Sequence, residues 1–173
     1  MFLQILGVAT KIIVADFSKP EVLPMIIRTI EESRIDVGVL VNNVGFLGPH
    51  AMPFLELDQD TVVNMININI LPATILCHAI LPKMKEKRKG AIINMSSTAS
   101  YWIHAVPYLA VYCSTKYYLS AFTQAIAAEY SDSGVTIQCV EPGLVDTQMA
   151  EYMDKVDSVV KVGLTSFRYN IAE

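Results

Sequence analysis

Tyr112 and Lys116 are the residues whose types and spacing offer chemistry most directly. A four-residue offset on a helix places the phenol and the ammonium on one face, about one turn apart. A free phenol, with a pKa of about 10, exchanges protons poorly at neutral pH, but a nearby cation favours the phenolate and lowers that pKa. We therefore predict that Tyr112 exchanges a proton with an alcohol or carbonyl oxygen, although this pair alone is also common on solvated helices.

Polar residues follow two short apolar runs of the sequence. Ser96 and Ser97 come directly after one run, and a segment from Asn42 to Gly45 follows another. Open α/β sheets bind ligands at the carboxyl ends of their strands, so both segments are candidates for a ligand site. The alternative is structural, because serines at a strand end satisfy backbone groups and Gly45 suits a turn with positive φ.

The elements that must position these residues follow from alternating patterns. Four apolar, β-rich runs alternate with longer helical ones, which predicts an α/β fold with a parallel sheet covered on both faces. No repeat, low-complexity stretch or Ser/Gly linker interrupts residues 1–173, so we expect a single domain. The predicted strands are Lys11–Ala15, Val37–Val41, Ala91–Met95 and Val135–Val140.

Three helical patterns separate the predicted strands. The first begins near Pro20 and ends near Ser33. The second runs from Thr61 to Lys89, and we expect it to kink or end near Pro82. The third extends from Tyr112 to about Tyr130. One side of it is predicted to carry Tyr112, Lys116, Leu119 and Thr123.

Composition excludes several classes of function. The chain of 173 residues is 53% hydrophobic and carries a net charge of −4, which argues against a nucleic-acid partner and favours a small apolar ligand. Its three cysteines lie far apart and form no metal-binding motif with the three histidines, so we expect no metal site. No uncharged apolar run reaches the roughly 18 residues of a membrane span.

An ordered set of motifs resembles the short-chain dehydrogenase/reductase family over nearly the whole chain. The set comprises Asp16, Asn42-Asn43-Val44-Gly45, Asn69, Ser97, Tyr112, Lys116 and Pro142-Gly143. The resemblance implies a doubly wound, Rossmann-like parallel sheet. The segments 65–70 and 90–97 are most similar to the branch that holds the 17β-hydroxysteroid dehydrogenases and the very-long-chain 3-oxoacyl-CoA reductases.

The resemblance also implies four catalytic residues. Tyr112 would be the acid/base, Lys116 would lower its pKa and bind the nicotinamide ribose, and Ser97 would orient the substrate carbonyl. Asn69 would hold a water of a proton relay, and the alternative is a helix-interior amide bonded to backbone. The residues implied in cofactor binding are Asp16 at the adenine, Asn42, Asn43, Val44 and Gly45 in the turn, Tyr112 and Lys116, and Pro142, Gly143 and Thr147 at the nicotinamide.

The implied activity is the reduction of a steroid or 3-oxoacyl ketone by hydride transfer from the reduced form of NADP, or alternatively of NAD, with Tyr112 protonating the alkoxide. A serine hydrolase built on Ser97 is disfavoured, because the sequence has no G-x-S-x-G elbow. The family's dimer would pair the helices that contain Thr61 and Tyr112 with those of a second copy. Analogy with the branch places the protein at the endoplasmic reticulum, or in the cytoplasm if it is soluble.

One motif of the family has no counterpart here. The T-G-x-x-x-G-x-G turn that binds the cofactor pyrophosphate is absent from the sequence, and we expect an N-terminally truncated chain that begins near the family's third strand. This predicts an exposed edge on the strand Val37–Val41 and little cofactor binding by this chain. The alternative function is a non-catalytic remnant that acts as a binding or dimerisation module.

Overall fold

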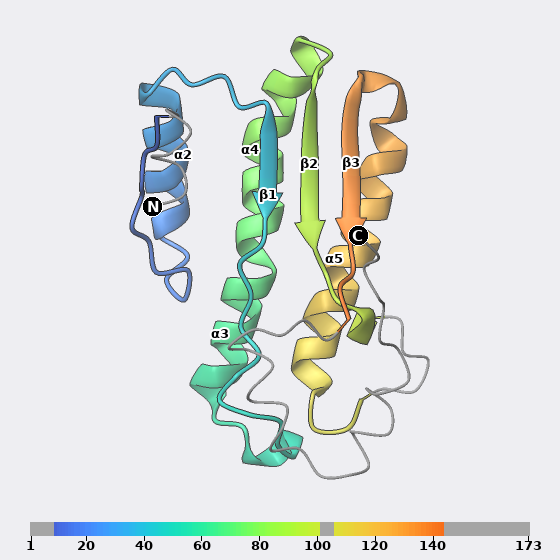
Figure 1. The fold of residues 1–173 in the computed structure, drawn as a ribbon. Helices are drawn as coiled ribbons and strands as arrows, with labels where there is room; N and C mark the ends of the chain where they lie inside the picture. Colours follow the sequence, from blue (N-terminus) through green and yellow to red (C-terminus); the bar gives the residue numbers. More distant parts are fainter. Residues whose placement is uncertain (1–8, 101–105, 144–173) are drawn as a thin grey trace.

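Three of the four predicted strands form one parallel sheet in the computed structural model, which describes residues 9–100 and 106–143. These strands are β1 (Val39–Asn42), β2 (Gly90–Met95) and β3 (Val135–Val140), in the spatial order β1-β2-β3 (Figure 1). Asn42 lies opposite Asn94, and Met95 lies opposite Val140. The carboxyl ends of the strands therefore meet at one edge, and the predicted α/β, Rossmann-like class is confirmed.

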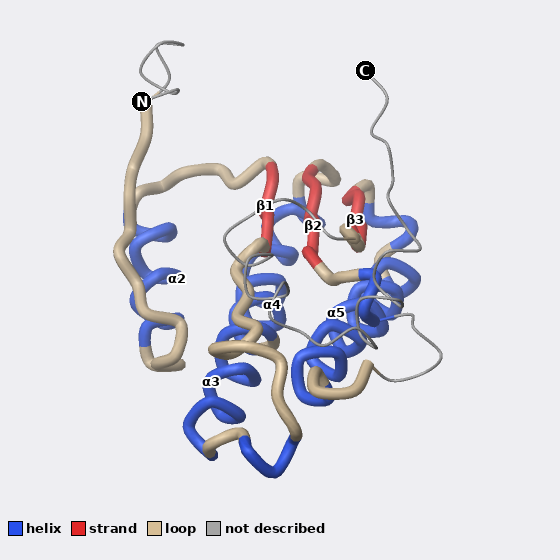
Figure 2. The backbone as a smooth tube through the Cα atoms, turned by 60° about the horizontal axis from the view of Figure 1, so that its bottom comes forward, coloured by secondary structure: helices blue, strands red, loops and turns tan. Residues whose placement is uncertain are grey.

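Two long helices cover one face of this sheet. These are α4 (Leu71–Glu86) and α5 (Ala110–Glu129), which lie on the same side of the strands in Figures 1 and 2. Met84 of α4 packs on Ile92 of β2 with both side chains fully buried. On the other face Val39 and Val41 are 58% and 53% exposed. Helices were predicted on both faces of the sheet, but within residues 9–100 and 106–143 they cover only one.

The predicted strand Lys11–Ala15 is not a strand. This segment is extended but unpaired, with Ile12 and Val14 86% and 88% exposed. Ile13 and Ala15 instead pack on the cluster built around α2 (Val22–Glu32). A strand needs a neighbour to satisfy its amides and carbonyls, and this segment lies against α2, apart from β1, the edge strand of the described sheet (Figure 1).

The second predicted helix breaks earlier than expected. It divides into α3 (Gln59–Asn69) and α4 at Ile70, where the backbone turns to φ −105° and ψ −57°. Pro72 lies in the first turn of α4, where its missing N–H costs nothing, whereas Pro82 lies inside α4 and the helix continues to Glu86. Of the two predicted alternatives, an end at Pro82 was therefore wrong and a kink there stays a prediction, while the break falls beside Asn69.

The helices α3 and α4 together are long and apolar enough to span a membrane by length and composition. In this structure, however, 44% of their most apolar window is buried inside the protein. Cys77, Ile80 and Leu81 of α4 belong to the core cluster that covers the sheet. Packing in the core thus accounts for part of the apolar character of the pair.

The remaining elements agree with the sequence patterns or are short. The first and third predicted helices are confirmed as α2 and α5, and Lys116, Leu119 and Thr123 share the buried side of α5 as predicted. Single 3-10 turns complete the description: η1 (Phe54–Glu56), η2 (Thr98–Ser100) and η3 (Ser131–Ser133).

Candidate active site

The carboxyl ends of β2 and β3 bring together two segments of the predicted site, the one that contains Ser97 and the one that contains Pro142. The amide of Ser96 donates to the carbonyl of Val140 at 2.8 Å, and the amide of Thr98 donates to the carbonyl of Pro142 at 3.1 Å. These bonds extend the parallel ladder beyond the strands. As a result, the segment that contains Ser97 lies directly beside Pro142.

Lys116 is buried at this edge and is only 4% exposed. Its Nζ donates to the carbonyl of Met95 at 2.9 Å, at the end of β2. Burial lowers the pKa of the ammonium to about 8, because the charged form loses its hydration. A Cβ atom on Gly45 would lie 3.3 Å from this Nζ, so the predicted turn after β1 also reaches the lysine.

Tyr112 lies one turn before Lys116 on α5, as the sequence predicts, with the lysine Nζ 5.8 Å from the centre of its ring. The ring packs against the buried cluster of Leu47, Val106 and Leu109. Burial raises the pKa of the phenol, and a side-chain hydrogen bond with Ser97 lowers it in part. Lys116 is not among the groups that lower the pKa of this phenol, since its ammonium donates to Met95, and its implied effect on Tyr112 stays a prediction.

The two serines after β2 differ in their surroundings. The Ser97 side chain interacts with Tyr112 and also accepts a bond of 3.2 Å from the amide of Ala99. Ser96 is 3% exposed, and its hydroxyl donates to the Lys116 carbonyl at 2.7 Å. The structural alternative therefore holds for Ser96, whereas Ser97 is left beside the phenol.

Asn69, at the end of α3, is 1% exposed and fully bonded to protein groups. Its Oδ1 accepts from the amide of Phe46 at 2.7 Å, and its Nδ2 donates to the Phe46 carbonyl and to Thr115 Oγ1, each at 2.9 Å. These contacts join the turn after β1 to α5. They match the backbone-bonded alternative for the side chain of Asn69.

The segment from Asn42 to Gly45 divides between the core and the surface. Asn42 is 6% exposed, and its Nδ2 donates to Asn94 Oδ1 at 2.8 Å; Asn94 in turn donates to Thr123 Oγ1 at 2.9 Å. The side chain of Asn42 thus holds β1 to β2 and α5. Asn43 is exposed, and Val44 and Gly45 are half-buried.

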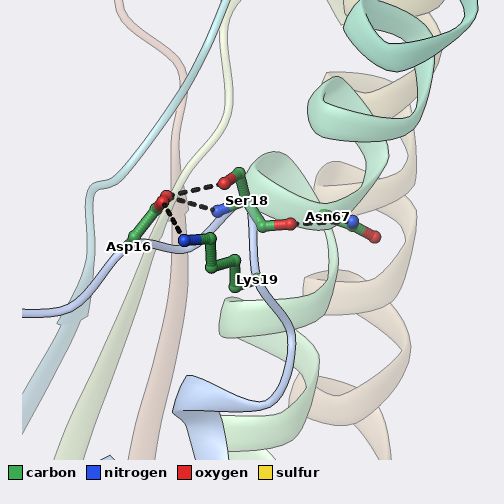
Figure 3. Close-up of polar contacts among 4 residues, drawn as sticks. All are labelled: Asp16, Ser18, Lys19 and Asn67. Carbon is green, nitrogen blue, oxygen red and sulfur yellow. Dashed lines mark hydrogen bonds and ion pairs between the residues drawn. The ribbon is translucent and has the colours of Figure 1, made fainter.

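Asp16 lies in the turn that leads to α2 (Figure 3). Its Oδ1 accepts from the amide and the hydroxyl of Ser18 at 3.0 and 2.7 Å, and these bonds lower the pKa of the carboxyl group. Lys19 Nζ lies 3.8 Å from Oδ2, and the Ser18 carbonyl accepts from Asn67 of α3 at 3.1 Å. Asp16 is therefore anchored to the helix that carries Asn69.

Two further predicted cofactor residues lie near the chain's later part. Gly143 is exposed at the end of the described segment, next to half-buried Pro142. Thr147 lies outside the described residues. Within residues 9–100 and 106–143 no group of three metal-ligating side chains occurs.

Comparison with known proteins agrees with this geometry. The family model of the short chain dehydrogenases matches residues 3–157. The chain belongs to the short-chain dehydrogenase family. The curated relatives place it on the branch of hydroxysteroid dehydrogenase-like proteins and very-long-chain 3-oxoacyl-CoA reductases that the sequence indicated.

Two relatives and one solved structure illustrate the family relationship. Over 142 residues the chain is 39% identical to inactive hydroxysteroid dehydrogenase-like protein 1 of Homo sapiens, covering 82% of the chain and 42% of that relative. It is 39% identical to very-long-chain 3-oxoacyl-CoA reductase of Anas platyrhynchos, covering 84% of the chain and 46% of that relative. The structure of ElxO with NADP bound aligns at a TM-score of 0.68 with 31% identity, covering 79% of the chain and 54% of that structure. The chain thus spans less than half the length of these two curated relatives.

Sequence reasoning missed several residues that hold the short-chain dehydrogenase site in place. They are Thr115, which accepts from Asn69, Asn94, which bridges Asn42 and Thr123, and Ser120, which contacts Ser96. A signal existed for two of them. Thr115 and Ser120 are polar residues adjacent to the predicted buried side of α5, a position that requires a buried partner.

Proposed function

We propose that this protein forms the nicotinamide and substrate side of an NAD(P)-dependent ketoreductase site that reduces a steroid or 3-oxoacyl ketone. The observation that carries this proposal is that the Ser97 side chain interacts with the Tyr112 phenol while Lys116 Nζ lies 5.8 Å from the centre of its ring. A phenol, a hydroxyl and an ammonium at one sheet edge form a group that can act on a single ligand oxygen.

Tyr112 would be the proton donor in this proposal. A phenol that burial keeps protonated at neutral pH can give its proton to an alkoxide as that charge develops. Ser97 would donate a hydrogen bond to the same carbonyl oxygen and orient it. Lys116, with its pKa of about 8, is mostly protonated at neutral pH and would stabilise negative charge on the phenol oxygen.

The described residues fit one end of a nicotinamide dinucleotide. Lys116 would bind the ribose, Gly45 leaves room beside its Nζ, and Pro142 lies next to the Ser97 segment. A bound nicotinamide would supply the hydride. We propose NADP as the cofactor, with NAD as the alternative, and the sequence contains no glycine-rich turn for the pyrophosphate.

The test is a chimera in which the glycine-rich βαβ unit of the aligned 3-oxoacyl-CoA reductase precedes this chain. With NADPH it should reduce 3-oxoacyl or steroid ketones, whereas the 173-residue chain alone should not turn over. Tyr112→Phe in the chimera should lower kcat by about 10²–10⁴-fold with cofactor affinity nearly unchanged. Tyr117→Phe, an exposed tyrosine of the same helix, is the control. A folded, NADPH-binding chimera without Tyr112-dependent reduction would refute the proposal.

A second candidate function is a non-catalytic dimerisation module, which one surface favours. The outer sides of the long helices expose several apolar side chains. They are Val63 and Ile66 of α3, Ile75 of α4, and Tyr117 and Tyr118 of α5. Tyr118 joins two of these helices, since its hydroxyl lies 3.1 Å from Thr74 Oγ1. A second copy would cover this surface, and a relative named as inactive is compatible with such a function.

The dimer is tested by sedimentation of the chain and of Tyr117→Glu. Native chain should sediment as a dimer and the variant as a monomer, because an unpaired charge would be buried in the contact. A monomeric native chain at tens of micromolar would contradict this candidate.

We place the protein at the endoplasmic reticulum by analogy with its branch, which imaging of a tagged chimera would check.

A further inference from the structure

Ser120, one turn after Lys116 on α5, is the centre of a buried cluster of hydroxyl groups. It is 2% exposed, and four oxygen atoms lie within hydrogen-bond distance of its Oγ. They are Glu141 Oε1 at 2.5 Å, Ser96 Oγ at 2.8 Å, Ser100 Oγ at 3.2 Å and the Lys116 carbonyl at 3.3 Å. The cluster joins β2, β3 and α5 at the edge where the active-site residues gather.

The carboxylate of Glu141 sets the direction of these bonds. An ionised carboxylate only accepts hydrogen bonds, so Ser120 must spend its single proton on Glu141. The hydroxyl protons of Ser96 and Ser100 go to backbone carbonyls, so both serine oxygens lie in close contact with Ser120 around this central bond. This charge-assisted bond is also the shortest of the four, in keeping with its greater strength.

Each part of the proposed active site lies one bond from this cluster. Ser96 donates to the carbonyl of Lys116 at 2.7 Å. Ser100 donates to the carbonyl of Ser97 at 2.7 Å. Glu141 directly precedes Pro142 in the sequence. The cluster therefore contacts the backbone carbonyls of Lys116 and Ser97, the two residues beside the Tyr112 side chain. It does not bond to the Lys116 ammonium or the Ser97 hydroxyl.

We propose that Ser120 and Glu141 are positioning residues, which fix α5 against the end of β2 and so set the places of Lys116 and Ser97. Apolar packing holds α5 on the sheet but has no direction, whereas hydrogen bonds from a strand end to one carbonyl define the helix's position along its axis. The importance of this role for catalysis rests on the proposed ketoreductase function. The positioning itself does not depend on that function.

One further side chain, that of Cys139, borders the cluster. The Sγ of Cys139 lies 3.8 Å from Ser120 Oγ and 3.7 Å from Glu141 Oε1. Burial raises the pKa of this thiol, so it stays neutral at neutral pH. The carboxylate of Glu141 is thus the charged group that orders these hydroxyls.

The experiment measures the pKa of Lys116 in the full chain by NMR of its side-chain carbon, assigned with Lys116→Arg. In Ser120→Ala and Glu141→Ala, α5 should loosen at Lys116 and admit water, so this pKa should rise by about 0.5 or more from about 8. Glu141→Gln keeps an acceptor for Ser120 and should leave it unchanged. Ser114→Ala, which removes a similar bond to a preceding carbonyl at an exposed site of α5, is the matched control.

Two results would overturn the proposal. One is an unchanged pKa of Lys116 in folded Ser120→Ala and Glu141→Ala. The other is an equal fall of that pKa in Glu141→Gln and Glu141→Ala, which would reveal a through-space charge effect in place of positioning. If circular dichroism finds Ser120→Ala unfolded, the two Glu141 variants decide, because Glu141 is only half-buried. No cofactor or substrate is present, so failure of the ketoreductase proposal would leave this outcome intact.

Discussion

The ammonium of Lys116 donates to the carbonyl of Met95 at 2.9 Å, two residues before Ser97 on the same chain segment. Because the Lys116 carbonyl also accepts from Ser96, the lysine is bonded to the end of β2 through both its side chain and its backbone. This double attachment places a buried cation beside Tyr112. It also carries a cost in stability, since an ammonium is poorly solvated there.

Lys116→Met should stabilise the fold at neutral pH. The fall of the lysine pKa from 10.5 to about 8 corresponds to about 3 kcal/mol against the buried charged form. Methionine removes that penalty, but the loss of the hydrogen bond to Met95 costs about 1 kcal/mol of stability. We expect a net gain of about 1–2 kcal/mol in the free energy of unfolding by urea at pH 7, and the same change should abolish ketone reduction in the chimera.

The gain from Lys116→Met should shrink as pH rises. Below pH 8 the lysine is charged in both the folded and unfolded states, so the penalty applies in full. Between about 8 and about 10.4 the unfolded chain binds more protons than the folded one, and native stability rises towards that of the variant. A gain that stays constant from pH 7 to 10.5 would show that burial does not lower the pKa of Lys116.

Gly45→Ala should disturb Lys116 without unfolding the protein. The added Cβ would lie 3.3 Å from Lys116 Nζ and 3.9 Å from Asn69 Oδ1, and the flexible end of the lysine can shift away. We expect a change of about 1 kcal/mol or less in unfolding free energy, with a displaced NMR signal of the Lys116 side chain. Gly38→Ala is the control, since its Cβ would meet nothing within 4 Å. Equal spectra for the two variants would contradict the contact.

Asn94→Ala should destabilise the carboxyl end of the sheet, where Asn94 lies in the central strand β2. Asn94 is fully buried, accepts from Asn42 and donates to Thr123, so alanine would remove one hydrogen-bond partner from each of these two buried side chains. We expect a loss of about 2–4 kcal/mol, measured by urea unfolding. The exposed neighbour Asn43, changed to alanine, should cost less than about 0.5 kcal/mol. Similar losses in both variants would argue against this buried network.

The parts of the fold that sequence predicted well are those determined by local pattern. The strands at Ala91–Met95 and Val135–Val140 and the helix that carries Tyr112 have apolar spacings that leave little choice of structure. The segment Lys11–Ala15 has the same strand-like composition but packs on α2, apart from the sheet (Figure 1). Strand formation there depends on a pairing partner, and composition does not report one.

The candidate site divides in the same way. The offset between Tyr112 and Lys116 follows from helix geometry and was predictable. The pKa of Tyr112 was not, because it depends on burial by Leu47, Val106 and Leu109, which come from distant or loop segments. The role of Ser120 was equally hidden, since its acceptor Glu141 lies 21 residues away.

Titration of the 173-residue chain with NADPH and NADH should give little binding. The residues that fit the nicotinamide end are present, but the sequence has no glycine-rich turn to bind the pyrophosphate, and Asp16 is bonded to its own turn. We expect dissociation constants of about 1 mM or weaker, measured by nicotinamide fluorescence. Reduced nicotinamide mononucleotide, which lacks the adenine half, is the matched ligand and should bind about as weakly as NADPH. Micromolar binding of NADPH together with Tyr112-dependent turnover of a ketone would show that the glycine-rich turn is dispensable in this protein.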